Sequence, residues 1–309
     1  MTVDQEFCYI FIGGAAKSGT TSLFQYMSDH PEICGAITKE TGFFLDDDYP
    51  FPNPRNITYK DGIDEFNKYF VDCHNQIYRL EATPTYLYST GTPSRIRNYY
   101  SNVKWIFILR EPISRLVSCY RFIKQIGKLD KDTSFREYVE HQFEFGEWRG
   151  SRCLITGRYS TYLPYFYELY PREDILVINF TELNQRPFQV LKRIAHNLGT
   201  QVSFYENYNF RVHNPTINIK NRKLHQIYNK VGRRFSHRNF PKNPGIRKLI
   251  KVNRKMVDYF YLRLNRAENE AVEIPQDLLT RLEEYYLPEK EVLPHILSIK
   301  NFDWDFGFH

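Results

Sequence analysis

Four short apolar runs, each bounded by turn residues, place the strongest constraint on the fold of this chain. They are Phe7–Ile12, Ile77–Glu81, Lys104–Leu109 and Ile175–Phe180. Because the runs are apolar through their length rather than alternating, they predict strands that are buried on both faces. Segments with helical spacing separate them, and this alternation is typical of a parallel sheet covered by helices.

The helical segments repeat apolar residues at the spacing of an amphipathic helix. They are Thr20–Asp29, Ile63–Phe70, Pro93–Tyr100, Ile113–Ile123, Ser134–Phe145, Tyr159–Tyr170, Pro187–Leu198, Ile246–Leu264 and Pro275–Tyr286. Pro275 suits the first turn of its helix. Since no stretch has the composition of a linker, we predict a single α/β domain over residues 1–309, with a central parallel sheet flanked by helices.

Composition supports a folded core, and the charge is unevenly distributed. Hydrophobic residues make up 42% of the chain and aromatic residues 17%, which argues against disorder. The net charge is +6, but the segment Arg211–Arg266 holds sixteen Lys or Arg and one acid, Asp258, so it carries +15 and the remainder −9. Such a block indicates either an anionic partner or a solvated helical face.

The sequence contains no apolar run of the length that spans a bilayer, roughly eighteen residues or more. The first residues also lack the pattern of a signal peptide, so we expect a cytoplasmic protein without a membrane span. The five cysteines show neither metal-ligand spacing nor a disulfide rhythm, and we predict reduced, mostly buried thiols. They are Cys8, Cys34, Cys73, Cys119 and Cys153.

The stretch "IFIGGAAKSGTTS" (residues 10–22) follows the first predicted strand and leads into a helix that begins near Thr20. Free N–H groups and the helix dipole favour an anion at such a P-loop-like position. Gly19 lets the backbone approach a ligand, and hydroxyls can donate to phosphate oxygens. These hydroxyls belong to Ser18, Thr20, Thr21 and Ser22. Lys17 precedes the glycine, whereas in nucleoside-triphosphate loops the lysine follows it. The alternative is an ordinary strand–turn–helix with a threonine cap.

A second stretch, "LREPISRLVSCY" (Leu109–Tyr120), also runs from a strand into a helix. The order "KSGTTSL" resembles the 5′-phosphosulfate loop of sulfotransferases that use 3′-phosphoadenosine 5′-phosphosulfate (PAPS). In that family an Arg and a Ser eight residues later bind the 3′-phosphate, and Arg110 and Ser118 stand at this offset. The planar guanidinium of an arginine can donate two parallel hydrogen bonds to phosphate oxygens.

Other stretches are similar to the heparan sulfate sulfotransferases: "HPEICGAITKETGFF", "EATPTYLYS" and the closing "FDWDF". This resemblance implies a single α/β domain, sulfuryl transfer from PAPS with release of adenosine 3′,5′-bisphosphate, and no metal. In the family, a Lys follows the Glu of the stretch similar to "EATPTYLYS", whereas Ala82 follows Glu81 here. We therefore expect a small-molecule or saccharide acceptor, such as a secondary metabolite, and no nucleic-acid partner. The late cysteine pair and the Golgi anchor of the animal enzymes are not found in this sequence, which favours a bacterial enzyme.

The resemblance also implies roles for individual residues. Lys17 stabilises the departing phosphate, by analogy with phosphoryl transfer, and Glu40 of "KETGFF" is the general base. Phe43 and Phe44 follow Glu40, and desolvation beside them would raise its pKa. The alternative is a surface ion pair between Glu40 and Lys39. His30 competes for the role of base, although "H-P" better fits a helix terminus.

Several assignments stay open. Glu81 either holds basic side chains near the donor or forms a structural ion pair. In the late basic stretch, residues Lys220, Asn221 and Arg222 are candidates for closing over the 3′-phosphate, with Arg211 and His213 as weaker ones. Two other functions remain: a nucleotide kinase or NTPase with an aberrant loop, and a non-catalytic polyanion-binding protein that uses residues 211–266.

Overall fold

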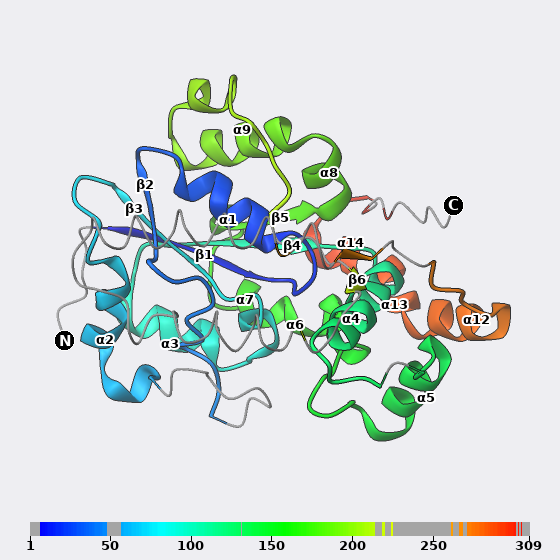
Figure 1. Ribbon diagram of the computed structural model, residues 1–309. Helices are drawn as coiled ribbons and strands as arrows, with labels where there is room; N and C mark the ends of the chain where they lie inside the picture. Colours follow the sequence, from blue (N-terminus) through cyan, green and yellow to red (C-terminus); the bar gives the residue numbers. More distant parts are fainter. Residues whose placement is uncertain are drawn as a thin grey trace.

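The computed structural model consists of a parallel sheet with helices on both faces (Figure 1). It describes residues 7–47, 57–130, 132–213, 218–219, 224, 261, 266–267, 271–300, 302 and 304. The predicted helix Ile246–Leu264 and the candidates Lys220, Asn221 and Arg222 lie outside the described residues, apart from Tyr261.

The central sheet has five parallel strands in the order β2-β3-β1-β4-β5. They are β1 (Cys8–Gly14), β2 (Ile33–Gly35), β3 (Tyr78–Ala82), β4 (Val103–Leu109) and β5 (Ile175–Asn179). The parallel sheet and four of its strands are confirmed. The edge strand β2 was not predicted, because three residues are too few to show periodicity. A separate antiparallel pair joins β6 (Asn218–Ile219) to β7 (Arg266–Ala267).

Alternate residues of the central strands face two different cores, which is why these strands are apolar throughout. Tyr9 and Phe11 of β1 lie in an aromatic cluster with Trp105 of β4. Ile10 and Ile12 face the opposite side and pack among aliphatic side chains that include those of α1 (Thr20–Ser28) and α9 (Pro187–Leu198). A third cluster joins α4 (Pro112–Gln125), α5 (Phe135–Phe145) and α12 (Gln276–Tyr285) beside the sheet.

The helices form a layer on each face of the sheet and a group at one end of it (Figure 1). On one face lie α1 (Thr20–Ser28), α8 (Phe180–Gln185) and α9 (Pro187–Leu198). On the other lie α2 (Ile63–Asn67), α3 (Thr92–Tyr99), α6 (Tyr159–Tyr162) and α7 (Pro164–Tyr167). The end group contains α4 (Pro112–Gln125), α5 (Phe135–Phe145), α12 (Gln276–Tyr285) and α13 (Leu287–Glu291), which α14 (Leu293–Leu297) follows in the chain.

Three predicted helices differ in detail from the structure. The segment Ile63–Phe70 is α2 followed by a 3₁₀ helix over Lys68–Phe70. The segment Tyr159–Tyr170 is two short helices, because Pro164 has no N–H to donate and begins a new helix. Pro275 caps α12 from the position before its first turn instead of lying inside that turn.

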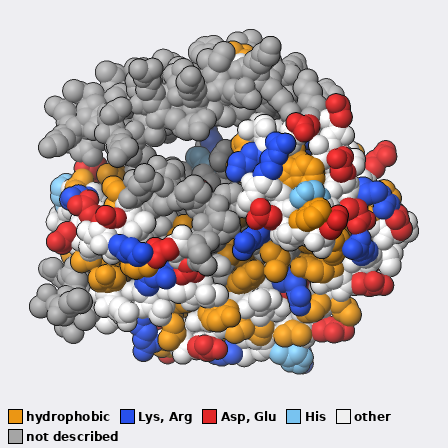
Figure 2. All heavy atoms as spheres, turned by 90° about the horizontal axis from the view of Figure 1, so that it is seen from below, with side chains coloured by type: hydrophobic (Ala, Val, Ile, Leu, Met, Phe, Trp, Pro, Cys, Tyr) orange, Lys and Arg blue, Asp and Glu red, His pale blue; other side chains and the backbone are white. Residues whose placement is uncertain are grey.

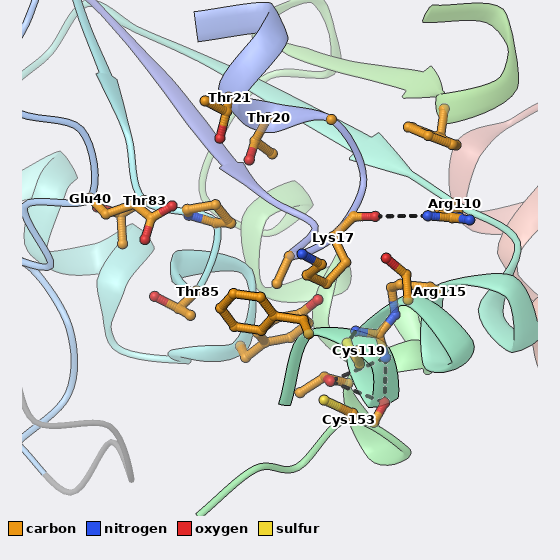
Figure 3. A pocket seen from close by; sticks show the side chains of 18 of the residues that line it. Lys17, Thr20, Thr21, Glu40, Thr83, Thr85, Arg110, Arg115, Cys119 and Cys153 are labelled. Carbon is orange, nitrogen blue, oxygen red and sulfur yellow. Dashed lines mark hydrogen bonds between the residues drawn. The ribbon is translucent and has the colours of Figure 1, made fainter. Parts of the chain in front are cut away.

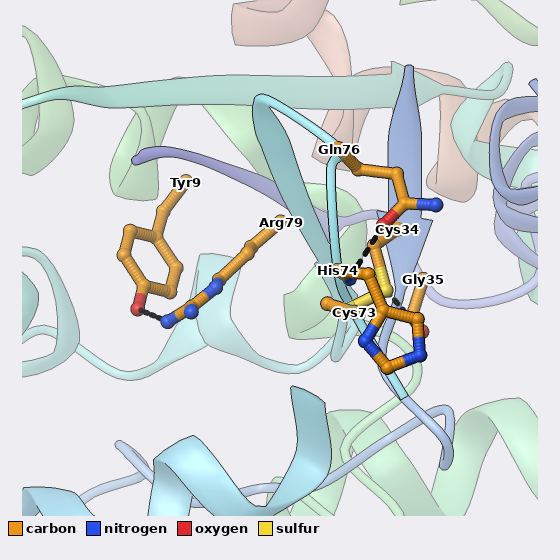
Figure 4. The surroundings of a disulfide bond; sticks show 7 residues. All are labelled: Tyr9, Cys34, Gly35, Cys73, His74, Gln76 and Arg79. Carbon is orange, nitrogen blue, oxygen red and sulfur yellow. Dashed lines mark hydrogen bonds between the residues drawn. A yellow bond between two sulfur atoms is a disulfide. The ribbon is translucent and has the colours of Figure 1, made fainter. Parts of the chain in front are cut away.

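The prediction that all cysteines are reduced is wrong for two of them. Cys34 of β2 and Cys73 form a disulfide with Cα atoms 5.7 Å apart, within the usual range (Figure 4). The two cysteines are 39 positions apart with no recognisable spacing. The pairing of β2 with β3 and a hydrogen bond from the Ile37 N–H to the Tyr69 carbonyl bring their segments together. Cys8, Cys119 and Cys153 are free thiols.

The described surface is mixed in charge, and acidic and basic side chains are interspersed on the face in Figure 2. Most of the basic segment 211–266 lies outside the described residues, so its predicted binding role is untested. No helix in the described ranges combines the length and the hydropathy needed to cross a bilayer.

Candidate functional site

The phosphate loop, residues 13–22, connects the carboxyl end of β1 to the amino end of α1. Gly19 has φ 82°, a left-handed conformation that favours glycine, and it occupies the N-cap position without a side-chain cap. The first N–H groups of α1 therefore lack the usual capping oxygen. A Cβ on Gly14 would lie 2.8 Å from the Cβ of Leu87, so the loop packs too closely for any larger residue there.

Lys17 and Arg110 both line the cavity beside this loop (Figure 3). Burial lowers the pKa of Lys17, whose Nζ lies 4.2 Å from the centre of the Phe122 ring. Burial also lowers the pKa of Arg110, which follows β4 directly and stacks 4.7 Å from the ring of Phe180. Arg110 Nη1 donates to the Lys17 carbonyl at 3.4 Å, so the two predicted motifs meet in space.

These two cations lack acidic partners: among the described residues neither Lys17 nor Arg110 forms an ion pair. Arg115, which also lines the cavity, is already engaged. Its guanidinium donates to Cys119 Sγ at 3.6 Å and to Thr156 Oγ1 at 3.2 Å. Because charges shielded from water need compensation, the two partly buried cations and the uncapped helix end are suited to an anion.

The predicted hydroxyls divide into two groups. Ser118 of α4 lines the cavity together with Thr20, Thr21 and Ser22 of α1. Ser22 Oγ also accepts from the N–H of His213, at 2.9 Å, which brings this weaker candidate to the cavity. Ser18 is fully buried, and its side chain is not among those lining the cavity.

The cavity has a volume of about 770 Å³, within the range of small-molecule sites. Its walls include several residues that the motifs did not indicate. Apolar ones are Leu45, Tyr88, Phe122, Ile126, Tyr162, Phe180 and Phe210, and polar ones are Thr83, Thr85 and Thr156. Phe122 lies one turn beyond Ser118 on α4, so its helical spacing was the available signal. Thr83 directly follows β3 in the stretch "EATPTYLYS", so its place at the carboxyl end of a strand was a signal, whereas Phe180 had none.

Glu40 lines the cavity, but not in the environment expected for it. Phe43 and Phe44 are fully buried in the core, whereas the Glu40 side chain is 61% exposed, so the rings do not desolvate its carboxylate. Glu40 instead pairs with Lys39, Nζ to Oε1 2.5 Å, as the alternative interpretation expected. Figure 3 shows Glu40 and Thr83 on the opposite side of Lys17 from Arg110.

His30 is not placed to act as a base in this cavity. Its side chain is buried beside Phe204, its Nε2 lies 3.0 Å from the Gln201 carbonyl, and its Nδ1 accepts from the Glu32 N–H at 3.2 Å. It follows the C-cap of α1, Asp29, as expected for a residue at a helix terminus. Both ring nitrogens are therefore occupied in joining α1 to neighbouring loops.

Glu81 fits neither interpretation given from the sequence. It is fully buried in β3, and among the described residues it forms no ion pair. Its Oε1 accepts from Thr41 and from Thr83. Burial raises its pKa to about 7. The desolvated carboxyl group that we expected at Glu40 is therefore found at Glu81, which is buried behind the cavity wall.

No cluster of three or more His, Cys, Asp or Glu side chains in the described ranges is arranged to hold a metal. The geometry around Lys17, Arg110 and the start of α1 suits a multiply charged anion such as a nucleotide.

Comparison with known proteins finds one matching family model and several related proteins. The family model described as "Sulfotransferase domain" matches residues 9–248. The chain is 34% identical over 131 residues to the membrane-associated sulfotransferase kil1 of Dictyostelium discoideum, which covers 41% of this chain and 26% of that protein. It is 24% identical over 209 residues to human heparan sulfate glucosamine 3-O-sulfotransferase 5, covering 66% of this chain and 57% of the relative.

A further relative is the human bifunctional heparan sulfate N-deacetylase/N-sulfotransferase 2, 27% identical over 198 residues, or 61% of this chain and 21% of that protein. The chain thus spans less than two thirds of the length of these relatives. A sulfotransferase from Alicyclobacillus acidocaldarius has the same fold, with a TM-score of 0.65 at 20% identity and coverage of 97% and 98%.

Proposed function

This chain belongs to the sulfotransferase family, whose members are enzymes that transfer sulfate, and we propose that it moves a sulfuryl group from PAPS to a hydroxyl or amine of a small-molecule or saccharide acceptor. One observation carries the proposal: two partly buried cations without acidic partners among the described residues, Lys17 and Arg110, meet at an uncapped helix start. PAPS supplies a sulfuryl group on an anhydride to phosphate and a second phosphate at the 3′ position. The two cations, one on each motif, match these two anionic groups.

Each residue of the site has a distinct task in this proposal. Lys17 directs its ammonium at the oxygen that gains negative charge as the anhydride opens. The N–H groups of α1, with the Thr20, Thr21 and Ser22 hydroxyls, hold the 5′-phosphate. Arg110 and Ser118 hold the 3′-phosphate, with the Arg110 guanidinium already fixed by stacking on Phe180.

Glu40 is the proposed general base. It lines the opposite side of the cavity from Arg110, where an acceptor would meet the sulfuryl group. Its ion pair with Lys39 is exposed, and exposed pairs contribute little stability, about 0–1 kcal/mol, so the carboxylate is free to exchange this partner for an acceptor hydroxyl.

The acceptor is proposed to be a small molecule, such as a secondary metabolite, rather than a polyanionic glycan. Leu45, Phe122, Ile126 and Tyr162 give the cavity apolar walls, which suit an uncharged acceptor body. The cytoplasmic location stays a prediction. The Cys34–Cys73 disulfide weighs against it, because the cytosol keeps most thiols reduced.

Thermal denaturation in the presence of nucleotides tests the proposal. Adenosine 3′,5′-bisphosphate at ~100 times its dissociation constant should raise the free energy of unfolding by about 2.7 kcal/mol, without magnesium, and more than ATP or AMP does. Arg110→Ala should remove most of this advantage. Arg97→Ala, an exposed arginine of α3, is the matched control and should keep it. Equal stabilisation by ATP, or full stabilisation of the Arg110 variant, would overturn the proposal.

A further inference from the structure

Glu81 is a buried carboxyl group with an unusual set of hydrogen bonds. Its Oε1 accepts from the Thr41 N–H at 3.1 Å, the Thr41 hydroxyl at 3.0 Å and the Thr83 hydroxyl at 2.6 Å. Its Oε2 has no hydrogen-bond partner among the described residues. A buried polar atom left unsatisfied is costly, so this arrangement calls for an explanation.

The bonds to Glu81 hold the Glu40 loop, which we define as residues 38–44. Around Glu81, other groups of β3 and the turn after it bind the same loop. The N–H of Glu40 donates to the Ala82 carbonyl at 2.8 Å, and the N–H of Gly42 donates to Thr83 Oγ1 at 3.1 Å. Thr83 Oγ1 therefore links Gly42 to Glu81 in a single chain of hydrogen bonds.

The backbone of this loop needs such support. Glu40 has φ 62° and Gly42 has φ 62°, both in the left-handed region. A residue with a Cβ is disfavoured there by roughly 1–2 kcal/mol, so Glu40 keeps this conformation only while the surrounding bonds impose it. The conformation in turn directs the Glu40 side chain to the cavity instead of into the core with Phe43 and Phe44.

We propose that Glu81 is a positioning residue that fixes Glu40 at the cavity wall through Thr41 and Thr83. The inference rests on the proposed role of Glu40 as the base. Glu81 does not itself line the cavity, and it acts on the reaction only through the loop.

The protonation state of Glu81 controls how firmly the loop is held. Burial raises its pKa to about 7, against the lowering effect of its hydrogen bonds and of Lys39. The charged or titratable side chains that face it are Lys39 and the buried phenol of Tyr86. An ionised carboxylate accepts its three donated hydrogen bonds more strongly than a neutral acid does. The loop therefore tightens as the pH rises through about 7.

Glu81→Gln and a matched control separate this role from general destabilisation. Glu289 of α13 is also buried, accepts from the N–H of Ser160 at 3.0 Å and from its hydroxyl, and lies outside the cavity lining. Burial raises its pKa as well. Each substitution therefore replaces a buried carboxyl group that accepts hydrogen bonds from a backbone N–H and from a hydroxyl.

We expect Glu81→Gln to lower kcat about tenfold and to leave the dissociation constant of adenosine 3′,5′-bisphosphate within twofold. The step in the pH profile of kcat near pH 7 should disappear in this variant. Glu289→Gln should keep both the rate and the step. Equal losses in the two variants, or an unchanged step in Glu81→Gln, would overturn the proposal.

Amide hydrogen exchange tests the same inference without activity. The N–H groups of Thr41 and Gly42 should lose about tenfold protection in Glu81→Gln at pH 8. In the wild-type protein the protection factors of these two amides should fall as the pH is lowered through 7. This measurement does not depend on the folding of any variant. If Glu40→Gln keeps full activity, the proposed base is wrong, while exchange still reports on Glu81. Unchanged protection in both measurements would refute the positioning role.

Discussion

The phosphate loop and the Glu40 loop share one backbone pattern but are supported in different ways. In each, a charged residue in the left-handed region is followed two positions later by a left-handed glycine: Lys17 at φ 69° and Gly19 at 82°, Glu40 at 62° and Gly42 at 62°. After Gly19 a helix begins at once. After Gly42 the chain enters the core, and Glu81 and Thr83, about forty residues away, hold the turn.

Because of this difference, substitutions in the two loops should affect stability, nucleotide binding and turnover in different ways. The phosphate loop leads directly into α1 and is held by the end of β4, where the Ala15 N–H donates to the Ile108 carbonyl and Arg110 donates to the Lys17 carbonyl. Its ammonium has no acidic partner among the described residues. The Glu40 loop depends on a buried carboxyl that is expensive to ionise, and such a cost is common where function needs a particular geometry. The following predictions test that contrast, from the largest expected effect to the smallest.

Removing the ammonium should have the largest effect. We expect Lys17→Ala to lower kcat by ~10²–10³-fold, the usual loss when one stabilising donor is removed from a transition state. Steady-state sulfuryl transfer with an accepted substrate measures this effect. Lys104→Ala serves as the control, since Lys104 pairs with Asp174 away from the cavity and should leave kcat unchanged. A loss of less than threefold in Lys17→Ala would refute its role at the leaving group.

The second prediction concerns the pH dependence of stability. The pKa of Glu81 is about 7 in the folded protein and 4.5 ordinarily, so between these values the folded state binds more protons than the unfolded state. Stability contributed at Glu81 therefore falls as the pH rises from 4.5 to 7, by about 3 kcal/mol in total, and is constant above.

Urea denaturation of the wild type and Glu81→Gln at pH 5 and pH 8 measures this effect. The variant should gain stability relative to the wild type at the higher pH. If the difference between the two proteins is the same at both pH values, Glu81 is not the group that titrates near 7.

The smallest effects should come from the two glycines. Gly19→Ala and Gly42→Ala each place a Cβ on a left-handed residue, at a cost of roughly 1–2 kcal/mol in the free energy of unfolding. Their functional effects should differ. The Cβ at position 19 would lie 3.3 Å from Phe180, beside the proposed nucleotide site, and should weaken bisphosphate binding about tenfold.

Gly42→Ala should instead lower kcat several-fold and leave bisphosphate binding within twofold, because it disturbs only the Glu40 loop. Calorimetric titration together with kinetics distinguishes the two. The contrast between the loops fails if both variants lose binding equally.

Much of this architecture could be predicted because it depends on short-range patterns. The apolar strands β1, β3, β4 and β5 begin and end within two residues of the predicted bounds, since burial on both faces requires continuous apolar runs. Lys17 and Arg110 could be placed at one site for a similar reason. Lys17 lies three residues beyond the end of β1 and Arg110 directly follows β4, and the carboxyl ends of these neighbouring strands meet at one edge.

Other features had no local signal. The three residues of β2, the Cys34–Cys73 disulfide and the aromatic wall at Phe180 depend on contacts between distant segments. The expected desolvation of Glu40 was wrong because adjacency in sequence says nothing about which side of the backbone a side chain takes. Glu40 and Phe43 follow one another closely, yet one points to the cavity and the other to the core.

The sequence by itself therefore determined the strand–helix alternation and the strand–turn–helix at Lys17, because both follow from residues that lie next to each other in the chain. Only the tertiary structure decided which carboxyl is desolvated, which arginine is left unpaired and how the Glu40 loop is held. These properties depend on burial and on hydrogen bonds between segments that meet only after the sheet has formed.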